Sequence, residues 1–193
     1  MSEKPNGIIL AGGKSSRMGA EKGLLKINGT PMIELAIRAL EPVVSNILII
    51  SANSNYLYLG RPLYPDRIED CGPSGGIYTG LLHSSTDMNI VLSCDTPNIT
   101  SAFLEYLILH AAEEDVLVPV SLGTKHPLSA VYKKGMQEKL MACIAAGEKK
   151  MTTLLGQFRV NYLDMDKQTQ FDSEILFRNI NTPEELQTEN NRH

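Results

Sequence analysis

The sequence lacks the features of several protein classes. It has no tryptophan and no apolar run near the ~18 residues that a transmembrane helix requires. Eighteen basic against 22 acidic side chains give a net charge of −4, which excludes the overall basic character of a nucleic-acid-binding protein. Residues 1–6 are polar and contain no apolar signal region. We therefore expect a cytoplasmic protein with neither a membrane nor a nucleic acid as its partner.

Cysteines are also few. Cys71, Cys94 and Cys143 are odd in number and widely spaced, which argues against a secreted disulfide framework and a CxxC metal site. A chain of 193 residues buries roughly 70% of its unfolded surface on folding, so it needs neither disulfides nor a metal for stability. Its length suits one domain, and we expect residues 1–193 to form a single one.

Short apolar runs rich in β-branched residues alternate with amphipathic segments along the chain. The predicted strands lie at 7–10, 47–50, 89–93 and 116–118, and the predicted helices at 31–40, 74–83 and 103–112. The second half is less regular, with a further strand predicted at 126–132, a helix at 136–146 and a capped helix start at Thr182, Pro183 and Glu185. This alternation is typical of an α/β fold with a mostly parallel sheet covered on both faces.

A glycine-rich, basic segment follows the first predicted strand. It reads Leu10-Ala11-Gly12-Gly13-Lys14-Ser15-Ser16-Arg17-Met18-Gly19-Ala20-Glu21-Lys22. Its glycines let backbone N–H groups approach an anion, and its cations, with Lys26 nearby, suit a polyphosphate. A Walker A loop would need glycine in place of Ile8, and the G-x-G-x-x-G pattern of dinucleotide-binding proteins is absent. We expect a phosphate-binding loop of another class rather than a solvated surface loop.

Asp95 follows the predicted strand at 89–93 and precedes Thr96 and Pro97. Carboxylates at strand ends face the ligand crevice of open α/β sheets. One or two carboxylates, together with substrate phosphates, commonly hold Mg²⁺ in nucleotide chemistry. Asp is equally common as a turn residue before proline, so Asp95 alone leaves both interpretations open. The basic loop after the first strand favours the metal ligand.

These segments resemble the signature of the sugar-nucleotide-type nucleotidyltransferases and, more closely, the molybdenum cofactor guanylyltransferases. The resemblance continues, in the family's order, through Gly72-Pro73-Ser74-Gly75-Gly76, Cys94-Asp95-Thr96-Pro97, His126-Pro127-Leu128 and Phe177-Arg178-Asn179-Ile180-Asn181-Thr182-Pro183-Glu184-Glu185-Leu186. It implies a Rossmann-like fold of the nucleotide-diphospho-sugar transferase type, a mostly parallel sheet flanked by helices. The N-terminal part would bind the nucleotide and the C-terminal part the acceptor.

The resemblance also implies a reaction, the transfer of GMP from Mg²⁺-GTP to the phosphate of molybdenum-bound molybdopterin with release of pyrophosphate. It implies catalytic roles for Lys22, Arg17 and Asp95, with Asp95 as the Mg²⁺ ligand. Contacts to GTP are implied for Leu10, Ala11, Gly12, Gly13, Lys22, Asn53, Asp66 and Asp95. Ser51 competes with Asn53 for the base-binding position, and Asn179 and Asn181 match the acceptor side. Other molybdenum cofactor biosynthesis proteins, or acceptor proteins, are further expected partners.

The chain departs from the family pattern at two places. Glu21 stands where an Asp usually precedes the lysine, and Ser74-Gly75 replaces a Leu-Ala pair. Gly12 favours guanine, because the related cytidylyltransferases tend to carry alanine at this position. A cytidylyltransferase, or another sugar-nucleotide-type nucleotidyltransferase, is the alternative.

Two remoter alternatives belong to other classes. Residues 72–76 match the G-x-S-x-G elbow of serine hydrolases, but the polar residues 65–71 are not the strand that this elbow requires. A regulatory domain that binds a nucleotide without catalysis would not need Arg17, Lys22 and Asp95 together. The sequence assigns no role to His126, Cys71 or Cys94.

Overall fold

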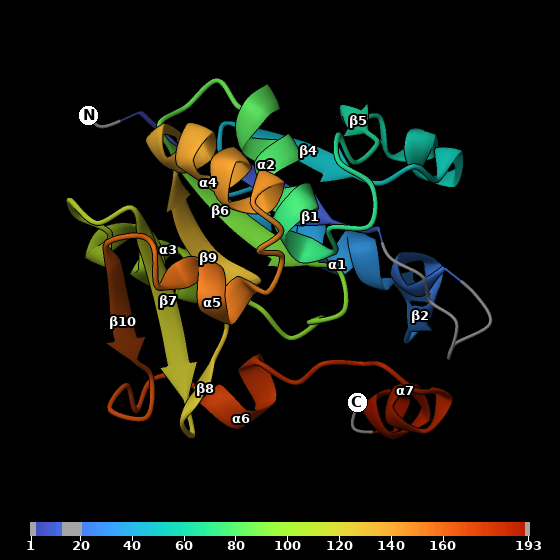
Figure 1. Ribbon diagram of the computed structural model, residues 1–193. Coiled ribbons are helices and arrows are strands. Elements are labelled where there is room, and N and C mark those ends of the chain that lie inside the picture. Colours follow the sequence, from blue (N-terminus) through green and yellow to red (C-terminus); the bar gives the residue numbers. More distant parts are fainter. Residues whose placement is uncertain (1–2, 13–20, 192–193) are drawn as a thin grey trace.

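A central sheet of eight strands organises the computed structural model, which describes residues 3–12 and 21–191 (Figure 1). The strand order is β10-β7-β9-β6-β1-β4-β5, with β8 paired to β7. The strands are β1 (Asn6–Leu10), β4 (Asn46–Ile50), β5 (Leu63–Tyr64), β6 (Met88–Ser93), β7 (Val116–Ser121), β8 (Thr124–Lys125), β9 (Ser129–Lys133) and β10 (Val160–Asp164). A separate antiparallel pair consists of β2 (Lys26–Ile27) and β3 (Thr30–Pro31).

The strands around β1 are parallel. Leu10, the last residue of β1, is in register with Ile50 of β4 and Ser93 of β6, so these three strands end at one edge of the sheet. β9 enters between β6 and β7 and is antiparallel to both, whereas β10 is parallel to β7. The carboxyl ends of β1, β4 and β6 therefore carry the segments that the sequence predicts to bind the nucleotide.

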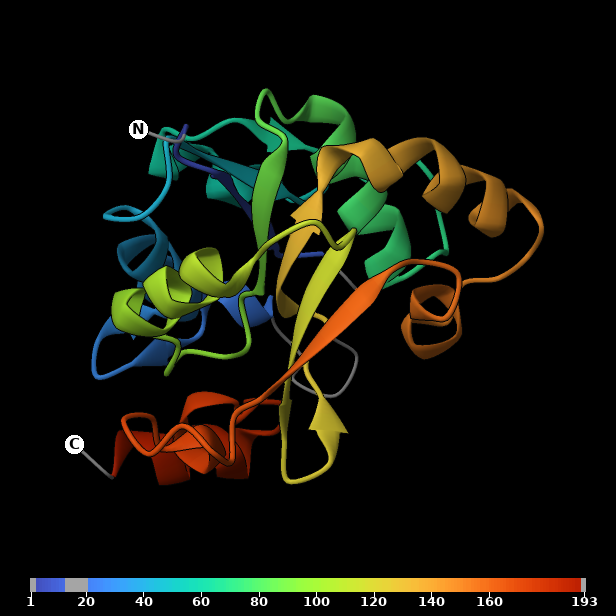
Figure 2. The same cartoon turned by 90° about the vertical axis from the view of Figure 1, so that its left-hand side faces the viewer.

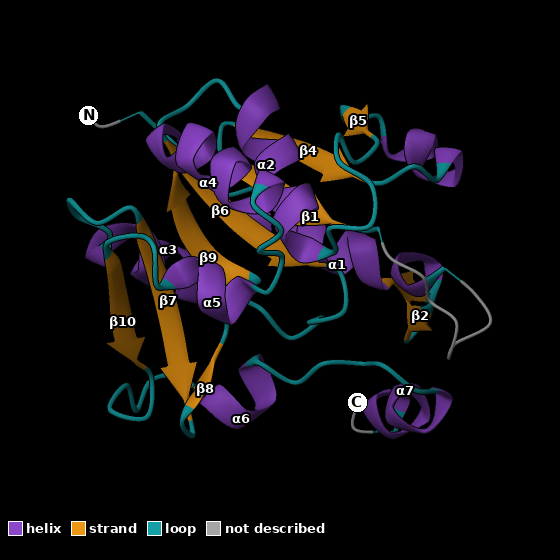
Figure 3. Cartoon of the chain, viewed as in Figure 1, coloured by secondary structure: helices purple, strands orange, loops and turns teal. Residues whose placement is uncertain are grey.

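Helices cover both faces of the sheet (Figures 2 and 3). They are α1 (Met32–Leu40), α2 (Pro73–His83), α3 (Ser101–His110), α4 (Gln137–Ala145), α5 (Met151–Leu155), α6 (Ser173–Leu176) and α7 (Pro183–Asn190), with 3-10 helices η1 (Lys22–Leu24), η2 (Ser54–Leu59) and η3 (Lys134–Met136). Successive strand residues point to opposite faces. Ile9 packs in the cluster formed with α1 and α3, and Ile8 in the cluster formed with α2, α4 and α5.

The predicted elements of the first half are confirmed. The predicted helix at 136–146 corresponds to η3 and α4, and Thr182 and Glu185 form the predicted capping box at the start of α7. The strand predicted at 126–132 begins only at Ser129, because His126 starts a turn closed by the Ser129 N–H to His126 O bond of 3.1 Å. Strand β10 has no counterpart among the predicted elements, because its residues are exposed or half-buried and form no continuous apolar run.

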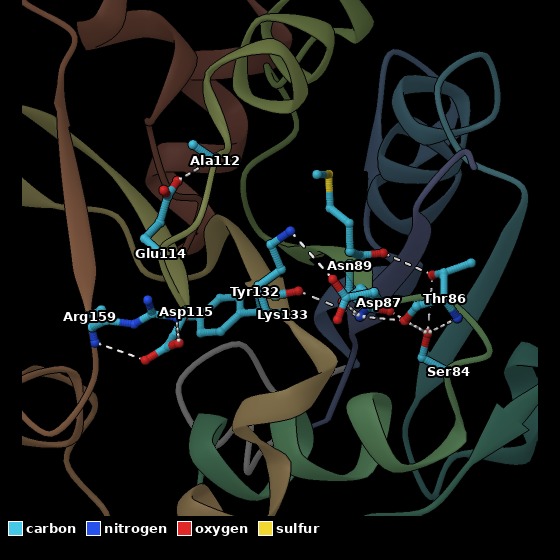
Figure 4. A network of polar contacts seen from close by, with 11 residues as sticks. Ser84, Thr86, Asp87, Asn89, Ala112, Glu114, Asp115, Tyr132, Lys133 and Arg159 are labelled. Atoms are coloured by element: carbon cyan, nitrogen blue, oxygen red, sulfur yellow. Dashed lines mark hydrogen bonds and ion pairs between the residues drawn. The ribbon is translucent and has the colours of Figure 1, made fainter. Parts of the chain in front are cut away.

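A polar network closes the opposite edge of the sheet, where β1 and β6 begin (Figure 4). The Asn6 side chain donates to Ser84 Oγ at 3.0 Å, and the Asn6 backbone N–H donates to Thr86 Oγ1 at 3.0 Å. Asn89 joins this network through Ser84 and through the Thr86 carbonyl. Because these buried groups bind one another, they stabilise the start of β1 and β6.

The C-terminal segment returns to the carboxyl edge of β1 and β6. Helix α7 lies beside β2, and Ile180 packs with Ile27 and Met32 in a small apolar cluster (Figure 1). Among the residues that the structure describes, no helix is long and apolar enough to cross a membrane.

Candidate active site

Three parallel strands bring the predicted site residues to one edge of the sheet. Beyond β1 the Ala11 N–H donates to Ile50 O at 3.0 Å, and the Cys94 N–H donates to Leu10 O at 3.2 Å. These bonds extend the pairing past the strand ends, so Gly12 is where the chain leaves the sheet. Asp95 follows Cys94 directly, so Ala11 and Gly12 leave the sheet next to the segment that carries this carboxylate.

Lys22 lies between Asp95 and Asn181. Its Nζ is 3.3 Å from Asp95 Oδ2 and donates to Asn181 Oδ1 at 2.6 Å. The Lys22 and Asp95 side chains are 24% and 17% exposed, so solvent or a ligand can still reach the pair. The structure thus joins a predicted catalytic lysine, the predicted metal ligand and a predicted acceptor residue.

Local bonds hold Asp95 in place. Its Oδ1 accepts a hydrogen bond from Ser93 Oγ at 2.5 Å, and its backbone carbonyl accepts the Ile180 N–H at 2.9 Å. The second bond fixes the segment that carries Asn179 and Asn181 against the end of β6. Asn181 contacts Lys22, whereas Asn179 is exposed.

Asp66 lies on the other side of Gly12. A Cβ at Gly12 would be 3.5 Å from Asp66 Oδ2, and a Cβ at Gly76 would be 3.4 Å from Asp66 Oδ1. Partial desolvation raises the pKa of Asp66 above its usual value, although the residue as a whole is exposed. A methyl group at Gly12 would make only ordinary contacts, so packing within the protein does not itself demand glycine there.

Both candidates for base binding lie near Lys22. Asn53 caps η2 by accepting the Asn55 N–H at 2.9 Å, and it donates to Glu21 Oε2 at 3.2 Å. Ser51 is buried, and its Oγ accepts the Asn53 N–H. Both side chains are engaged by protein groups, and a base contact for either remains a prediction. Gly13 and Arg17 lie outside the described residues.

The serine hydrolase alternative does not fit the structure. Ser74 is fully buried on α2, and its Oγ donates to Cys71 O at 2.8 Å. The nearest preceding strand is β5, which ends at Tyr64 and does not lead directly into this turn. Cys94 is buried as well, and burial raises the pKa of its thiol to about 12, so it is a poor nucleophile.

Two contacts between distant segments border this site, one from His126, whose role the sequence left open, and one from Tyr56, which the sequence did not single out. His126 stacks on Phe177 with ring centroids 3.9 Å apart, which links the turn before β9 to the C-terminal segment. Tyr56 donates to Glu21 Oε1 at 2.9 Å, beside Lys22. The sequence could not give either contact, because each joins segments far apart in the chain.

Comparisons with known proteins identify the family of this chain. The sequence model of the MobA-like NTP transferase domain matches residues 7–161. A probable molybdenum cofactor guanylyltransferase of Flavobacterium johnsoniae is 40% identical over 93% of both chains. A molybdenum cofactor guanylyltransferase of Vibrio vulnificus is also 40% identical, over 93% of this chain and 91% of the relative.

A solved structure gives the same result for the fold. Molybdopterin-guanine dinucleotide biosynthesis protein A of Archaeoglobus fulgidus has a TM-score of 0.82 and 26% identity, over 97% of each chain. The expected nucleotide-diphospho-sugar transferase type of fold is confirmed, and the chain is a nucleotidyltransferase. The match of the domain model over most of the chain, with these relatives, shows that the chain belongs to the MobA-like NTP transferase family, within its group of molybdenum cofactor guanylyltransferases.

Proposed function

We propose that this enzyme transfers GMP from GTP to the phosphate of molybdenum-bound molybdopterin and releases pyrophosphate. The names of the curated relatives support the donor and the acceptor. The observation that carries the proposal is the position of Lys22, whose Nζ contacts both Asp95 and Asn181. A cation there would face the donor phosphates from one side and the acceptor phosphate from the other.

The reaction joins two anions, so charge neutralisation dominates catalysis. An oxygen of the acceptor phosphate attacks the α-phosphorus of GTP. The bond from the α-phosphorus to the bridging oxygen breaks, and pyrophosphate leaves with the electron pair. The attacking phosphate is largely ionised near neutral pH, since its second pKa is about 6, and no general base is required.

Each residue of the predicted site has its own role in this reaction. Lys22 stabilises the negative charge that develops on the α-phosphoryl oxygens. Gly12 lets the nucleotide approach the backbone beyond β1. Asp66 lies beside Gly12 and would accept hydrogen bonds from hydroxyl or N–H groups of the nucleotide. Asn181 orients the Lys22 ammonium toward the acceptor. Arg17 keeps its predicted role at the leaving phosphates.

Asp95 fits a magnesium ion that arrives with the substrate. The described residues hold no group of three or more His, Cys, Asp or Glu side chains that could retain a metal alone. One strand-end carboxylate together with nucleotide phosphates and water is a common Mg²⁺ arrangement. Asp95 would hold the ion, and the ion when bound would neutralise phosphate charge.

The reaction is tested by measuring pyrophosphate release with each of the four NTPs, Mg²⁺ and molybdenum-loaded molybdopterin. We expect turnover with GTP and little with CTP. Comparable turnover with CTP would place the enzyme with the cytidylyltransferases instead. Binding of GTP with no pyrophosphate release from any NTP would indicate a regulatory nucleotide-binding protein.

The metal assignment is tested with Asp95→Asn. Asparagine keeps the size of the side chain, the turn propensity and the backbone bond to Ile180, so the fold should persist. We expect turnover to fall by about 10² or more, with partial recovery at high Mg²⁺. Asp115→Asn is the matched control. Asp115 lies away from the site, and its Oδ1 is 2.9 Å from Arg159 Nη2. Wild-type turnover and unchanged Mg²⁺ dependence in Asp95→Asn would contradict the assignment.

A further inference from the structure

Tyr56 contacts the chain on both sides of Lys22. Its hydroxyl donates to Glu21 Oε1 at 2.9 Å on one side of Lys22 and lies against Gly23 on the other. The contact with Gly23 is close, because a Cβ at that position would lie 2.5 Å from the Tyr56 hydroxyl. Tyr56 itself is fully buried, so its ring gives the hydroxyl a fixed position.

The backbone that carries Lys22 has little stability without contacts from other segments. It begins η1, a 3-10 helix of three residues, and a single turn of this kind has little stability of its own. No side-chain cap closes the N-terminus of η1. The position of the Lys22 ammonium therefore depends on contacts that other segments make with its neighbours in the chain.

The Glu21 carboxylate connects η1 to η2. Tyr56 donates to its Oε1, and Asn53 donates to its Oε2 at 3.2 Å. Both donors belong to η2 or its cap, directly after β4, so the sheet fixes them. Hydrogen bonds to a carboxylate are stronger than those between neutral groups, and two of them set its orientation.

We propose that Tyr56 is a positioning residue for Lys22, acting through Glu21 and Gly23. This inference rests on the proposed function, in which Lys22 stabilises the reacting phosphate. The hydroxyl holds the residues before and after Lys22, so the ammonium stays in reach of both Asp95 and Asn181. Displacing a catalytic group by about 1 Å can lower a rate about 10²-fold.

Tyr56→Phe tests the proposal, because it removes the hydroxyl and keeps the buried ring. We expect kcat for pyrophosphate release to fall about tenfold or more, while KM for GTP changes less than about threefold. Tyr58→Phe is the matched control on the same η2, where the Tyr58 hydroxyl donates to Glu34 Oε1 at 3.0 Å. It should keep wild-type kcat. A lower melting temperature of Tyr56→Phe with unchanged kcat would overturn the proposal and leave Tyr56 a core residue only.

A double-mutant cycle tests the route through Glu21. If Tyr56 acts on Lys22 through this carboxylate, the fold loss in kcat of the double variant should be smaller than the product of the losses of the two single variants. We expect Tyr56→Phe to lower kcat much less in a Glu21→Ala background than in the wild type. Losses that multiply fully would contradict an action through Glu21.

A chemical measurement separates this inference from the proposed function. The folded protein is treated with acetic anhydride in the absence of substrates. Mass spectrometry then gives the acylation rate of Lys22 relative to that of the exposed Lys26. We expect the ratio of rates to rise at least about threefold in Tyr56→Phe and to stay unchanged in Tyr58→Phe. An unchanged ratio in Tyr56→Phe overturns the positioning role. Failure of the wild type to release pyrophosphate overturns the proposed function and leaves this readout intact.

Discussion

At the scale of single residues, the contacts of Lys22 matter more for its position than for stability. A partly exposed ion pair such as Lys22 with Asp95 contributes only about 0–1 kcal/mol to folding. The bond from Lys22 to Asn181 spans 159 positions of sequence and brings the C-terminal segment to the nucleotide edge of the sheet.

Asn181→Ala removes that bond and keeps the turn around it. The Asn181 N–H donates to Glu185 Oε2, and alanine retains this backbone bond and the capping box of Thr182. We expect turnover with the acceptor to fall about tenfold, the equivalent of one hydrogen bond to a charged group. GTP affinity, measured by calorimetry, and the melting temperature should change little. Equal losses of GTP affinity and turnover, with a lower melting temperature, would instead make Asn181 a structural turn residue.

Asp66→Asn tests the second carboxylate of the site. Partial desolvation raises the pKa of Asp66 in the folded state, so its ionisation weakly opposes folding. The contribution of Asp66 to stability is therefore highest below its unfolded pKa near 3.9, and it falls as pH rises through the folded pKa. We expect the variant to bind GTP more weakly and to melt slightly higher than the wild type at pH 7. The gain in melting temperature should vanish near pH 4, and a gain that persists there would contradict this origin.

At the scale of elements, glycines in α2 set the distance between this helix and β1. A Cβ at Gly80 would overlap Ile8 Cγ2 and lie 2.8 Å from Ile8 Cδ1, and a Cβ at Gly76 would lie 3.0 Å from Leu10 Cδ2. Helix α2 therefore packs closely on the strand that leads to Gly12. Glycine lowers intrinsic helix propensity, but packing against the sheet overrides that preference here.

Gly80→Ala should destabilise the protein by overpacking this contact. Inserting a methyl group into a well-packed core costs about 1–3 kcal/mol, which for a chain of this size lowers the melting temperature by about 3–10 °C. Gly135→Ala is the control, because no atom lies within 4 Å of a Cβ at that position. Calorimetric scans of both variants check the prediction, and equal melting temperatures for the two would contradict it.

At the scale of the whole molecule, contacts from distant segments tie the C-terminal segment to the rest of the fold. His126 stacks on Phe177, the Ile180 N–H donates to the Asp95 carbonyl, and the Asn98 side chain donates to Glu189 Oε1 of α7 at 3.0 Å. The acceptor side of the predicted site therefore depends on contacts made by the last part of the chain.

The His126 stack makes part of the stability pH-dependent. Burial lowers the pKa of His126, so the folded state disfavours its protonation. The stabilisation is present above the unfolded pKa near 6.5 and is lost as pH falls through the folded pKa. We expect the free energy of unfolding, measured with urea from pH 7.5 to 5, to fall less steeply in His126→Phe than in the wild type. Parallel pH profiles would show that His126 does not contribute.

The sequence by itself determined the strands β1, β4, β6 and β7, the helices α1, α2 and α3, and the place of Asp95 at a strand end. These features are local: β-branched runs define buried strands, and the residue after a parallel strand lies at its carboxyl edge. The capped start of α7 was predictable for the same reason, since Thr182 and Glu185 are three residues apart.

Only the tertiary structure decided which distant segments meet. The insertion of β9 between β6 and β7, the edge strand β10, and the bonds of Lys22 to Asn181 and of Tyr56 to Glu21 carry no local signal. Each depends on contacts between segments far apart in the chain, which form only when the sheet and its helices pack together. A pattern within one segment can specify its own conformation, but the free energy of these contacts depends on both partners at once, and packing of the whole chain selects them.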